Sequence, residues 1–533
     1  MNLARLYRTL LHIRFRQIVA RLWFRLRRVS VGQIDQPELA LVKSAWSKSV
    51  RKNVDILGEF RFRLLNKIME VRDPQDWNDP RQDKLLLYHL HYHDVLNATE
   101  SDLVSFDGAA LIDRWIADNP PVVGNGWEPY PLSLRIVNWI KWHLEGNNLG
   151  APALASLFLQ ARALSQQIEY HLMANHIFAN AKALYFAGVF FDGAEPAKWR
   201  RAAIDILRVE LPEQILADGG HFELSPMYQS IISEDVLDIL NIGRAFGVVS
   251  FGDLSGVAKR MIDWLSVMSH GDGLPSYFND ATAGVAPPLQ DISAYGKRLG
   301  ISNDDSIPDG IHQLSESGYV RYQDGPVAVI VDVGQIGPDY QPGHAHCDCL
   351  SFELSIGANR LLVNSGISTY NANMRRLLER QTAAHNTVSI VGHEQSEVWS
   401  AFRVGRRARP AWVEVGNAFI SAEHDGYRPA GITHRRRLSF DAGQVVIVDK
   451  LEAHESARGI AHFHFHPDAI PAINGQVVRL DKVTMTFDGA ASVELQDYEY
   501  SQGFNKLASA KKVAVSFAAK LTTSIQYEDP VCF

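Results

Sequence analysis

The chain has 533 residues, of which 46% are hydrophobic and 21% charged, and its formal net charge is −7. This hydrophobic fraction is ordinary for a folded protein and excludes a disordered or fibrous chain, and the length predicts more than one domain. The excess of acidic residues argues against a dedicated nucleic-acid binder. Three cysteines are too few for a disulfide framework, and no apolar run of about 18 residues predicts a membrane-spanning helix. These properties indicate a large globular protein, most consistent with an enzyme.

Residues 1–36 form a basic segment, in which the first 28 residues contain eight arginines and no acidic residue. The arginines interrupt every apolar stretch, so the uninterrupted core of a secretory signal is missing. We therefore expect a cytoplasmic or membrane-peripheral location, with the periplasm or cell envelope as the alternative. Apolar residues recur near helical spacing and predict a basic amphipathic helix: Leu3, Leu6, Leu10, Ile13, Ile18 and Leu22.

This basic helix has two interpretations. It could attach peripherally to an anionic membrane surface or to an acidic polymer, because its cationic side chains suit both. Alternatively, it could pack on the body of the protein and leave its arginines in solvent.

Residues 37–312 show the apolar spacing of helices, most clearly over residues 84–99, 133–146, 153–191 and 234–248. Short breaks rich in Gly, Pro, Asn and Asp separate these runs, and no fixed sequence repeat is present. Many successive antiparallel helices predict an (α/α) toroid rather than a small bundle.

Residues 316–533 change to the alternating pattern of short strands, with turn residues between them. Strands without intervening helices predict an antiparallel β-sandwich. The predicted fold class is therefore α+β multidomain, an N-terminal (α/α) toroid followed by a C-terminal β-sandwich. The predicted strands lie within residues 318–334, 349–366, 385–392, 411–427, 434–453, 475–489 and 511–527.

The densest polar cluster is the segment GHAHCDCLSFEL, which contains His344, His346, Cys347, Asp348 and Cys349. In a strand, alternate side chains share one face, so the two histidines and Asp348 would lie opposite the cysteines. Two histidines one residue apart can bind one metal ion, or divide between a metal and a substrate. A polar strand end with buried cysteines is the alternative interpretation.

Three further segments carry His, Asn and Tyr but few carboxylates: Asn175 and His176 in NHIFANAKAL, Glu223 and Tyr228 in DGGHFELSPMYQ, and His385 in AHNTVSIVG. A glycoside hydrolase needs two opposed carboxylates, for which Glu223 and Asp348 are the candidates. The motifs of serine nucleophile elbows and of phosphate-binding P-loops are absent from the sequence.

These segments resemble a known family, the heparinase II/III-like polysaccharide lyases. The similarity runs from about residue 127 to 396 and comprises WEPYPLSLRIVNW, NHIFANAKAL, DGGHFELSPMYQ, GHAHCDCLSFEL with LLVNSG, and AHNTVSIVGHEQS. The resemblance implies β-elimination at a uronic acid of an acidic polysaccharide, such as a heparan-type chain or alginate. It also implies that the substrate is the main partner.

The resemblance also implies roles for four residues. Removal of the C5 proton of a uronate places further negative charge on its carboxylate, which must be stabilised while a base and an acid move protons. Asn175 and His176 match the pair that neutralises the carboxylate. Tyr228 matches the tyrosine that acts as acid and, beside a cation, as base, and His344 matches the histidine base.

The same resemblance implies a structural zinc site at His346, Asn364 and His385, although the elimination itself requires no cofactor. The family usually has Asp where this chain has Asn364. A neutral amide is a poorer zinc ligand than a carboxylate. We therefore predict weak or absent zinc, restored by Asn364→Asp, unless Asp348 or Cys347 supplies the anionic ligand.

Arginines and one tyrosine are candidates for substrate binding. Arg375, Arg376 and Arg380 precede the His385 segment, Tyr370 follows the strand that ends in Asn364, and Arg403 belongs to a later basic cluster. Guanidinium groups bind carboxylate or sulfate by two parallel hydrogen bonds. The alternative is that the arginines lie on strand edges in solvent.

Two other functions remain open from the sequence. One is a glycoside hydrolase on the same scaffold, and the other is a non-catalytic protein that binds glycans or takes part in envelope polysaccharide assembly.

Overall fold

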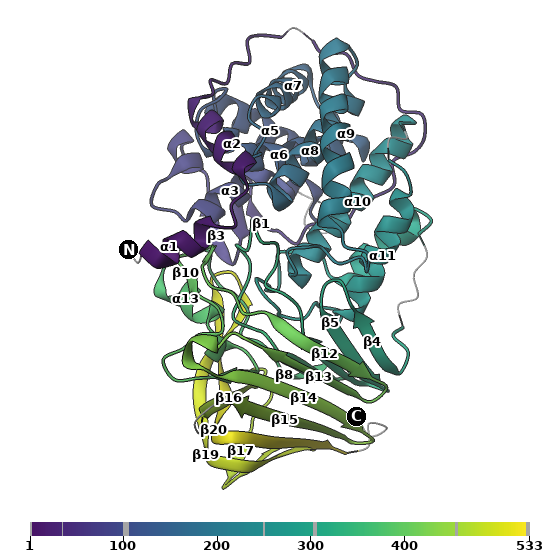
Figure 1. Ribbon diagram of the computed structural model, residues 1–533. Helices are drawn as coiled ribbons and strands as arrows, with labels where there is room; N and C mark the ends of the chain where they lie inside the picture. Colours follow the sequence, from purple (N-terminus) through teal and green to yellow (C-terminus); the bar gives the residue numbers. More distant parts are fainter. Residues whose placement is uncertain are drawn as a thin grey trace.

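The computed structural model describes residues 3–34, 36–99, 106–248, 251–301, 306–453 and 457–528. Helices dominate the N-terminal part and antiparallel sheets the C-terminal part, and the two stack on each other (Figure 1). This arrangement confirms the predicted fold class. The helices are α1 (Leu3–Leu10), α2 (Phe15–Leu26), α3 (Lys84–Tyr92), α5 (Gly108–Asp118), α6 (Pro129–Leu144), α7 (Ala151–Ser165), α8 (Ala174–Phe190), α9 (Ala194–Gln214), α10 (Pro226–Phe246), α11 (Leu254–Val267), α12 (Leu289–Arg298) and α13 (Met374–Arg380).

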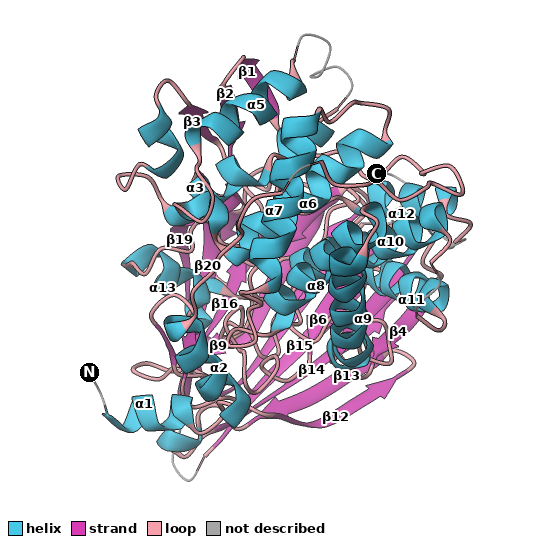
Figure 2. Cartoon of the chain, turned by 90° about the horizontal axis from the view of Figure 1, so that it is seen from above, coloured by secondary structure: helices cyan, strands magenta, loops and turns pink. Residues whose placement is uncertain are grey.

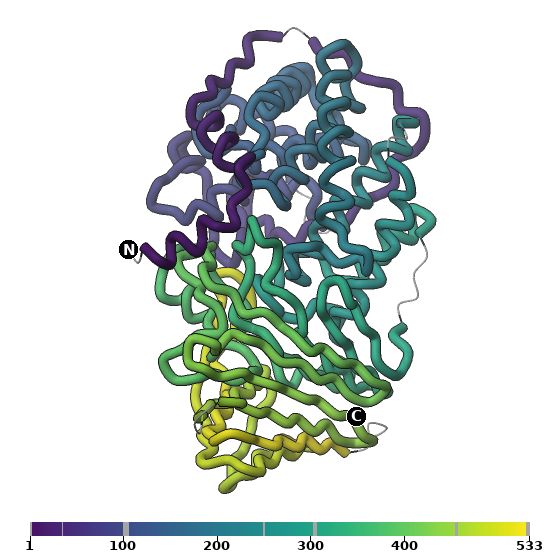
Figure 3. Tube along the Cα trace, in the orientation of Figure 1, coloured from purple at the N-terminus to yellow at the C-terminus, as the bar shows by residue number. Residues whose placement is uncertain are grey.

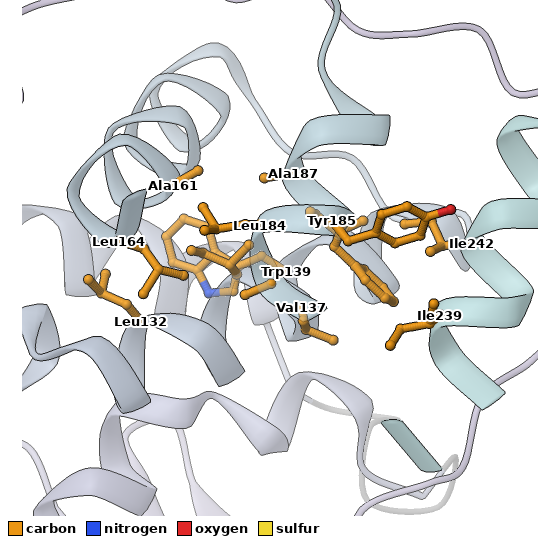
Figure 4. Close-up of a cluster of buried hydrophobic side chains, with 14 of the residues drawn as sticks. Leu132, Val137, Trp139, Ala161, Leu164, Leu184, Tyr185, Ala187, Ile239 and Ile242 are labelled. Atoms are coloured by element: carbon orange, nitrogen blue, oxygen red, sulfur yellow. The ribbon is translucent and has the colours of Figure 1, made fainter. Parts of the chain in front are cut away.

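The helical part is organised around α8. Nearly every residue of α8 is buried, because α6, α9 and α10 pack around it. Trp139 of α6 and Leu184 of α8 lie in the same apolar cluster (Figure 4). A helix that is apolar on all sides can be stable only in such an interior position.

The sandwich consists of two sheets, and every strand pairing in them is antiparallel. The five-stranded sheet has the order β4-β5-β6-β7-β8. Its strands are β4 (Gly310–Leu314), β5 (Tyr319–Asp324), β6 (Val327–Asp332), β7 (Phe352–Ile356) and β8 (Asn359–Leu362). Val329 of this sheet and Ile447 of the larger sheet belong to one core, which fills the space between the two layers.

The larger sheet follows the order β12-β13-β14-β15-β20-β19-β18-β17, and β16 pairs with both β20 and β9. In β15, buried and less buried residues alternate, as a strand with one face in a core requires. The strands are β9 (Val388–Ser389), β12 (Pro410–Gly416), β13 (Phe419–His424), β14 (Thr433–Asp441), β15 (Gln444–Glu452), β16 (Arg458–His464), β17 (Ala472–Asn474), β18 (Val477–Leu480), β19 (Val483–Gly503) and β20 (Lys506–Tyr527); β10 (Val398–Trp399) and β11 (Arg403–Val404) form a separate pair.

Two features differ from the sequence-based expectations. Residues 37–83 were expected to be helical, but they hold a small antiparallel sheet of β1 (Asp55–Gly58), β2 (Arg61–Leu64) and β3 (Lys67–Glu70). The segment around His344 was considered as a strand, but residues 333–351 form a loop between β6 and β7. This loop reaches toward the helical part.

The N-terminal segment runs along the outside of the helical part (Figure 3). Backbone hydrogen bonds hold it there, from Ala40 to Phe190 and from Lys43 to Ala245. Viewed from above, helices lie over the sheets, with α1 and α2 at the periphery (Figure 2). Within the described ranges, no helix has both the length and the apolar character to cross a membrane.

Candidate active site

A cavity of about 660 Å³ lies between the helical part and the loops of the sheet part. Its wall combines residues from α3, α6, α8 and α10 with loop residues 341–344, 370–371 and 400–403. Six of the predicted site residues line it: Asn175, His176, Tyr228, His344, Tyr370 and Arg403. The fold therefore brings together side chains that are up to 228 residues apart in the sequence (Asn175 to Arg403).

Tyr228 is positioned by the start of α10. Ser225 caps this helix, and its hydroxyl oxygen accepts a hydrogen bond from the Tyr228 backbone N–H at 3.2 Å. The Tyr228 ring packs against the His344 ring with centroids 4.1 Å apart, and its hydroxyl lies 3.2 Å from that of Tyr370. Burial raises the pKa of Tyr228 well above its usual value, so the phenol is protonated.

Asn175 and His176 begin α8, and each is held by a carboxylate. The Asn175 amide nitrogen lies 3.0 and 3.1 Å from the two oxygens of buried Glu223. Both oxygens lie in one direction, so a single N–H serves them and the second N–H is available. The His176 Nδ1 lies 3.2 Å from Glu169. Burial lowers the pKa of His176, but Glu169 outweighs it, and the net pKa is raised above 6.5.

His344 is held by Asp280, a residue that the sequence analysis did not identify. The His344 Nδ1 donates to Asp280 Oδ2 at 2.8 Å, and its Nε2 lies 3.3 Å from Glu223. Asp280 also accepts hydrogen bonds from His346 and from both terminal nitrogens of buried Arg376. Burial would raise the pKa of Asp280, but Arg376 and the two histidines hold it well below 3.8.

Backbone strain surrounds this site. Non-glycine residues with a left-handed backbone flank its functional residues, and such conformations cost about 1–3 kcal/mol each and cluster at functional sites. They are Met173 (φ 63°) and Ala174 (φ 51°) before Asn175, Leu224 (φ 57°) after Glu223, and Asn279 (φ 55°) before Asp280.

The end of the cavity between α8 and α10 holds a network of buried charges. Lys182 on α8 forms ion pairs with Asp235 and Asp238 on α10, each at 2.5 Å. Lys52 and Lys141 contact Glu234, also on α10, at 2.6 and 3.1 Å. Because each lysine faces a carboxylate, this end offers hydrogen-bonding groups rather than a free cation.

Three predicted substrate-binding arginines do not line the cavity, which corrects the expectation from the sequence. Arg376 is fully buried against Asp280, and Arg380 is fully buried against the carbonyls of Ala345 and Ala401. Arg375 pairs with Glu379 and Glu499 outside the cavity. Helix α13 turns Arg376 and Arg380 inward, where they support the loops that carry His344 and Phe402. The arginines that line the cavity are Arg21 and Arg403.

The predicted metal site consists of two histidines in a defined hydrogen-bond chain. Asp280 can only accept, so the His346 Nε2 carries a proton toward it at 2.8 Å. The Asn386 N–H points at Asn364 Oδ1, so the His385 Nδ1 donates to that same oxygen at 3.2 Å. The other ring nitrogens, His346 Nδ1 and His385 Nε2, therefore carry lone pairs and no proton. These two nitrogens lie 3.3 Å apart.

A zinc ion fits this arrangement. Two nitrogens of a tetrahedral zinc site, each about 2.0–2.1 Å from the ion, lie about 3.3 Å apart. The third converging donor is Asp348, whose carboxylate lies with the two histidines in a group spanning 4.8 Å. Asn364 Oδ1 contacts His385 Nδ1, the ring nitrogen that points away from His346. Asn364 is therefore not among the donors that converge on the candidate zinc position. Cys347 points elsewhere, with its thiol donating to the Ser396 carbonyl.

The comparisons with known proteins agree with this fold. The family model described as "Heparinase II/III N-terminus" matches residues 114–291, and that described as "Heparinase II/III-like, C-terminal" matches residues 307–528. The chain therefore belongs to the heparinase II/III-like family of polysaccharide lyases.

Two relatives show how broad this family is. FtsZ-localized protein C of Caulobacter vibrioides is 28% identical over 447 residues, covering 75% of this chain and 72% of that protein. A heparin-sulfate lyase of Bacteroides stercoris is 26% identical over 321 residues, covering 56% of this chain and 46% of the lyase. The chain thus aligns with about half of that enzyme.

Solved structures show the same fold. A heparinase III structure has a TM-score of 0.66 at 17% identity, with 83% of this chain and 76% of that chain covered. Heparan sulfate lyase HepC from Pedobacter heparinus has a TM-score of 0.55 at 18% identity and covers 96% of this chain, while 88% of that chain is covered. At these identities the similarity establishes the architecture alone.

Proposed function

We propose that this protein is a polysaccharide lyase that cleaves a uronate-containing acidic polysaccharide by β-elimination. One observation carries the proposal: Asn175, His176, Tyr228 and His344 line a single cavity, with the tyrosine and histidine rings in contact. The elimination needs a carboxylate-binding group, a base and an acid at one sugar. These four side chains supply all three.

Asn175 and His176 bind the substrate carboxylate. The free N–H of Asn175 and the cationic ring of His176 stabilise the charge that grows there as C5 loses its proton. The raised pKa of His176 keeps more of its imidazolium at neutral pH, since Glu169 offsets the cost of burial.

His344 and Tyr228 move the protons. Asp280 fixes the proton of His344 on Nδ1, so Nε2 accepts the C5 proton, and the imidazolium that forms lies between two carboxylates. Tyr228 is protonated and donates to the departing 4-oxygen of the sugar. This division assigns the base role to His344 and the acid role to Tyr228.

A glycoside hydrolase is the second candidate, and one observation favours it. Asp235 lines the cavity, and burial raises the pKa of its carboxyl group, as a general acid requires. Against it, Asp235 is ion-paired with Lys182, and Glu223 does not line the cavity. Asp235 and Glu223 therefore do not form the opposed pair of carboxylates that hydrolysis uses.

The two functions differ in their products. The full-length protein is incubated with heparan sulfate, alginate and unsulfated uronate polymers, and both ultraviolet absorbance and new reducing ends are measured. Elimination leaves a C4–C5 double bond conjugated to the carboxylate, so absorbance and reducing ends rise together. Reducing ends without absorbance would identify a hydrolase, and the absence of both across the panel would remove the catalytic proposal.

A further inference from the structure

Helices α1 and α2 expose an unusual amount of apolar surface. In the described chain, 10 of the 28 exposed large hydrophobic residues lie in residues 3–26. Phe15 is 77% exposed, Leu22 58% and Leu26 82%, values far above those of ordinary residues on a helix that packs on a protein. Both helices lie at the periphery of the molecule in two views (Figures 1 and 2).

The exposed apolar residues of α2 form one continuous face. At about 100° per residue, they fall within an arc of roughly 140°: Phe15, Ile18, Val19, Leu22, Trp23 and Leu26. The opposite side carries Gln17, which is 6% exposed and whose amide lies 3.4 Å from the Tyr340 carbonyl. A surface helix normally turns its apolar face to the core. In α2 that orientation is reversed.

Helix α1 is oriented in the same way. It exposes Leu3, Tyr7 and Leu10, while Arg8 on its other side pairs with Glu397 and Thr9 is buried. The body of the protein therefore holds both helices largely by polar contacts, although the Phe24 ring of α2 also packs against His171 with centroids 4.0 Å apart. The strongly exposed apolar residues named above face solvent in the described chain.

Unpaired arginines border the apolar face of α2. Arg16, Arg25 and Arg28 form no ion pair with a carboxylate among the described residues, whereas Arg14 pairs with Glu213. On the helical projection, Arg16 lies on one flank of the apolar arc and Arg25 on the other. An apolar face bordered by cations is complementary to a lipid surface that is apolar inside and anionic at its headgroups.

We infer that α1 and α2 dock this protein on an anionic phospholipid membrane, with their apolar residues inserted at the headgroup boundary. The choice of a membrane over a protein partner rests on the charge, because these residues combine bulky apolar side chains with arginines and no acid. Arg21 of α2 also lines the cavity, so docking places the cavity next to the membrane surface.

Vesicle flotation of the full chain tests this inference, with vesicles of phosphatidylcholine alone and of phosphatidylcholine mixed equally with phosphatidylglycerol. We expect binding to the mixed vesicles and at least about tenfold weaker binding for Phe15→Gln/Leu22→Gln, which removes two inserting side chains. Arg25→Gln/Arg28→Gln should weaken vesicle binding by about fivefold for each charge removed. Added salt should weaken vesicle binding by the wild type.

Ile470→Gln is the matched control, because Ile470 is 83% exposed but lies in the sheet part, and it should bind as the wild type does. Failure of the wild type to float with anionic vesicles would overturn the inference, as would unchanged binding by the Phe15/Leu22 variant. Light scattering that shows an oligomer in the wild type and a monomer in that variant would instead identify a second copy as the occupant.

Discussion

Asp280 is the residue on which the site depends most, although it does not contact the cavity. Its carboxylate accepts hydrogen bonds from His344, His346 and Arg376, and it thereby joins the proposed base His344 to a histidine of the candidate metal site. The sequence analysis missed it because a single Asp in a loop of the helical half carries no motif. Its role appears only when the fold brings residue 280 beside the β6–β7 loop.

Replacing Asp280 with Asn should lower kcat by roughly 10³-fold while leaving KM nearly unchanged. An amide can donate to His344 Nδ1 and so favour the tautomer with its lone pair on the wrong nitrogen. The variant should also lose about 3 kcal/mol of stability, since Arg376 loses its buried counterion. Steady-state kinetics and urea unfolding measure the two effects.

Asp449→Asn is a matched control for this prediction. Asp449 is equally buried and binds His434 and Arg436, but it lies in the sandwich and does not line the cavity. The Asp449→Asn variant should lose about as much stability as Asp280→Asn and keep the wild-type kcat. Equal rate losses in both variants would show that the effect of Asp280 is structural only.

The candidate metal site, which adjoins Asp280, gives a second prediction. The sequence predicted weak zinc because of Asn364, whereas the geometry supplies Asp348 as the anionic donor beside the two histidines. We expect elemental analysis to find zinc in the purified wild type, and Asp348→Asn to remove most of it. Zinc that is absent from the wild type but present in Asn364→Asp would instead support the expectation from the sequence.

Helices α8 and α10 carry most of the site between them. Asn175 and His176 begin α8, Tyr228 begins α10, and the buried ion pairs of Lys182 join the two helices about two to three turns further on. A buried ion pair contributes little net stability, but removal of one partner is costly because the other charge stays buried. The network therefore fixes how the two helices are placed relative to each other.

Lys182→Met should destabilise the protein by about 3–5 kcal/mol, because buried Asp235 would lose its ion-pair partner and Asp238 would keep only Lys141. Lys259→Met is the control, since Lys259 pairs with Asp263 on an exposed face of α11 and should cost less than about 1 kcal/mol. Chemical unfolding of both variants measures the difference. Similar small losses in both would show that the network does not hold the helices together.

The secondary structure could be predicted well where one pattern dominates. Residues 133–146 and 234–248 have clear helical spacing, and they lie in α6 and α10. The pattern failed for β1 to β3, which have only four residues each, and for residues 490–503 of β19, of which only three are buried. In such strands, pairing with neighbours decides the structure, and a local pattern cannot show it.

The prediction of the site was similarly uneven. Residues within motifs, such as Tyr228 and His344, could be placed at the cavity from the sequence because their neighbours identify the family. The placement of Arg376 and Arg380 could not, because only the fold determines which face of α13 is buried. Glu169 was missed for the same reason as Asp280: its contact with His176 requires the turn between α7 and α8.

Buried histidines throughout the molecule should make its stability depend on pH. Burial lowers the pKa of His91 to about 3, of His221 to about 4 and of His462 to about 3. Between these values and 6.5 the unfolded state binds more protons, so the free energy of unfolding falls as the pH is lowered through this range. Carboxyl groups whose pKa burial raises, such as Asp348 at about 6 and Asp332, act in the opposite direction and offset part of this loss.

We expect the urea midpoint to fall clearly between pH 7 and pH 5, where each of these histidines costs roughly 2 kcal/mol. Between pH 7 and pH 8 it should stay nearly constant, which serves as the internal control. Equal midpoints at pH 7 and pH 5 would show that these histidines do not titrate as their burial implies.

At the scale of the whole molecule, the cavity suits the proposed lyase, but the relatives of the chain have names of different kinds. The names of its relatives include both heparin-sulfate lyases and an FtsZ-localized protein, so membership of the family does not by itself establish catalysis. What favours catalysis in this chain is that Tyr228, His344, Asn175 and His176 are all present and line one cavity.

The most direct test is the ultraviolet absorbance produced from uronate polymers by the wild type, Tyr228→Phe and His344→Ala. We predict that the wild type forms the unsaturated product from at least one polymer. Each variant should lose at least about 100-fold in rate, the contribution of a proton-transfer group, while it keeps the wild-type unfolding midpoint. No absorbance from any polymer, or variant rates within about tenfold of the wild type, would contradict the assignment of this cavity as the site of β-elimination.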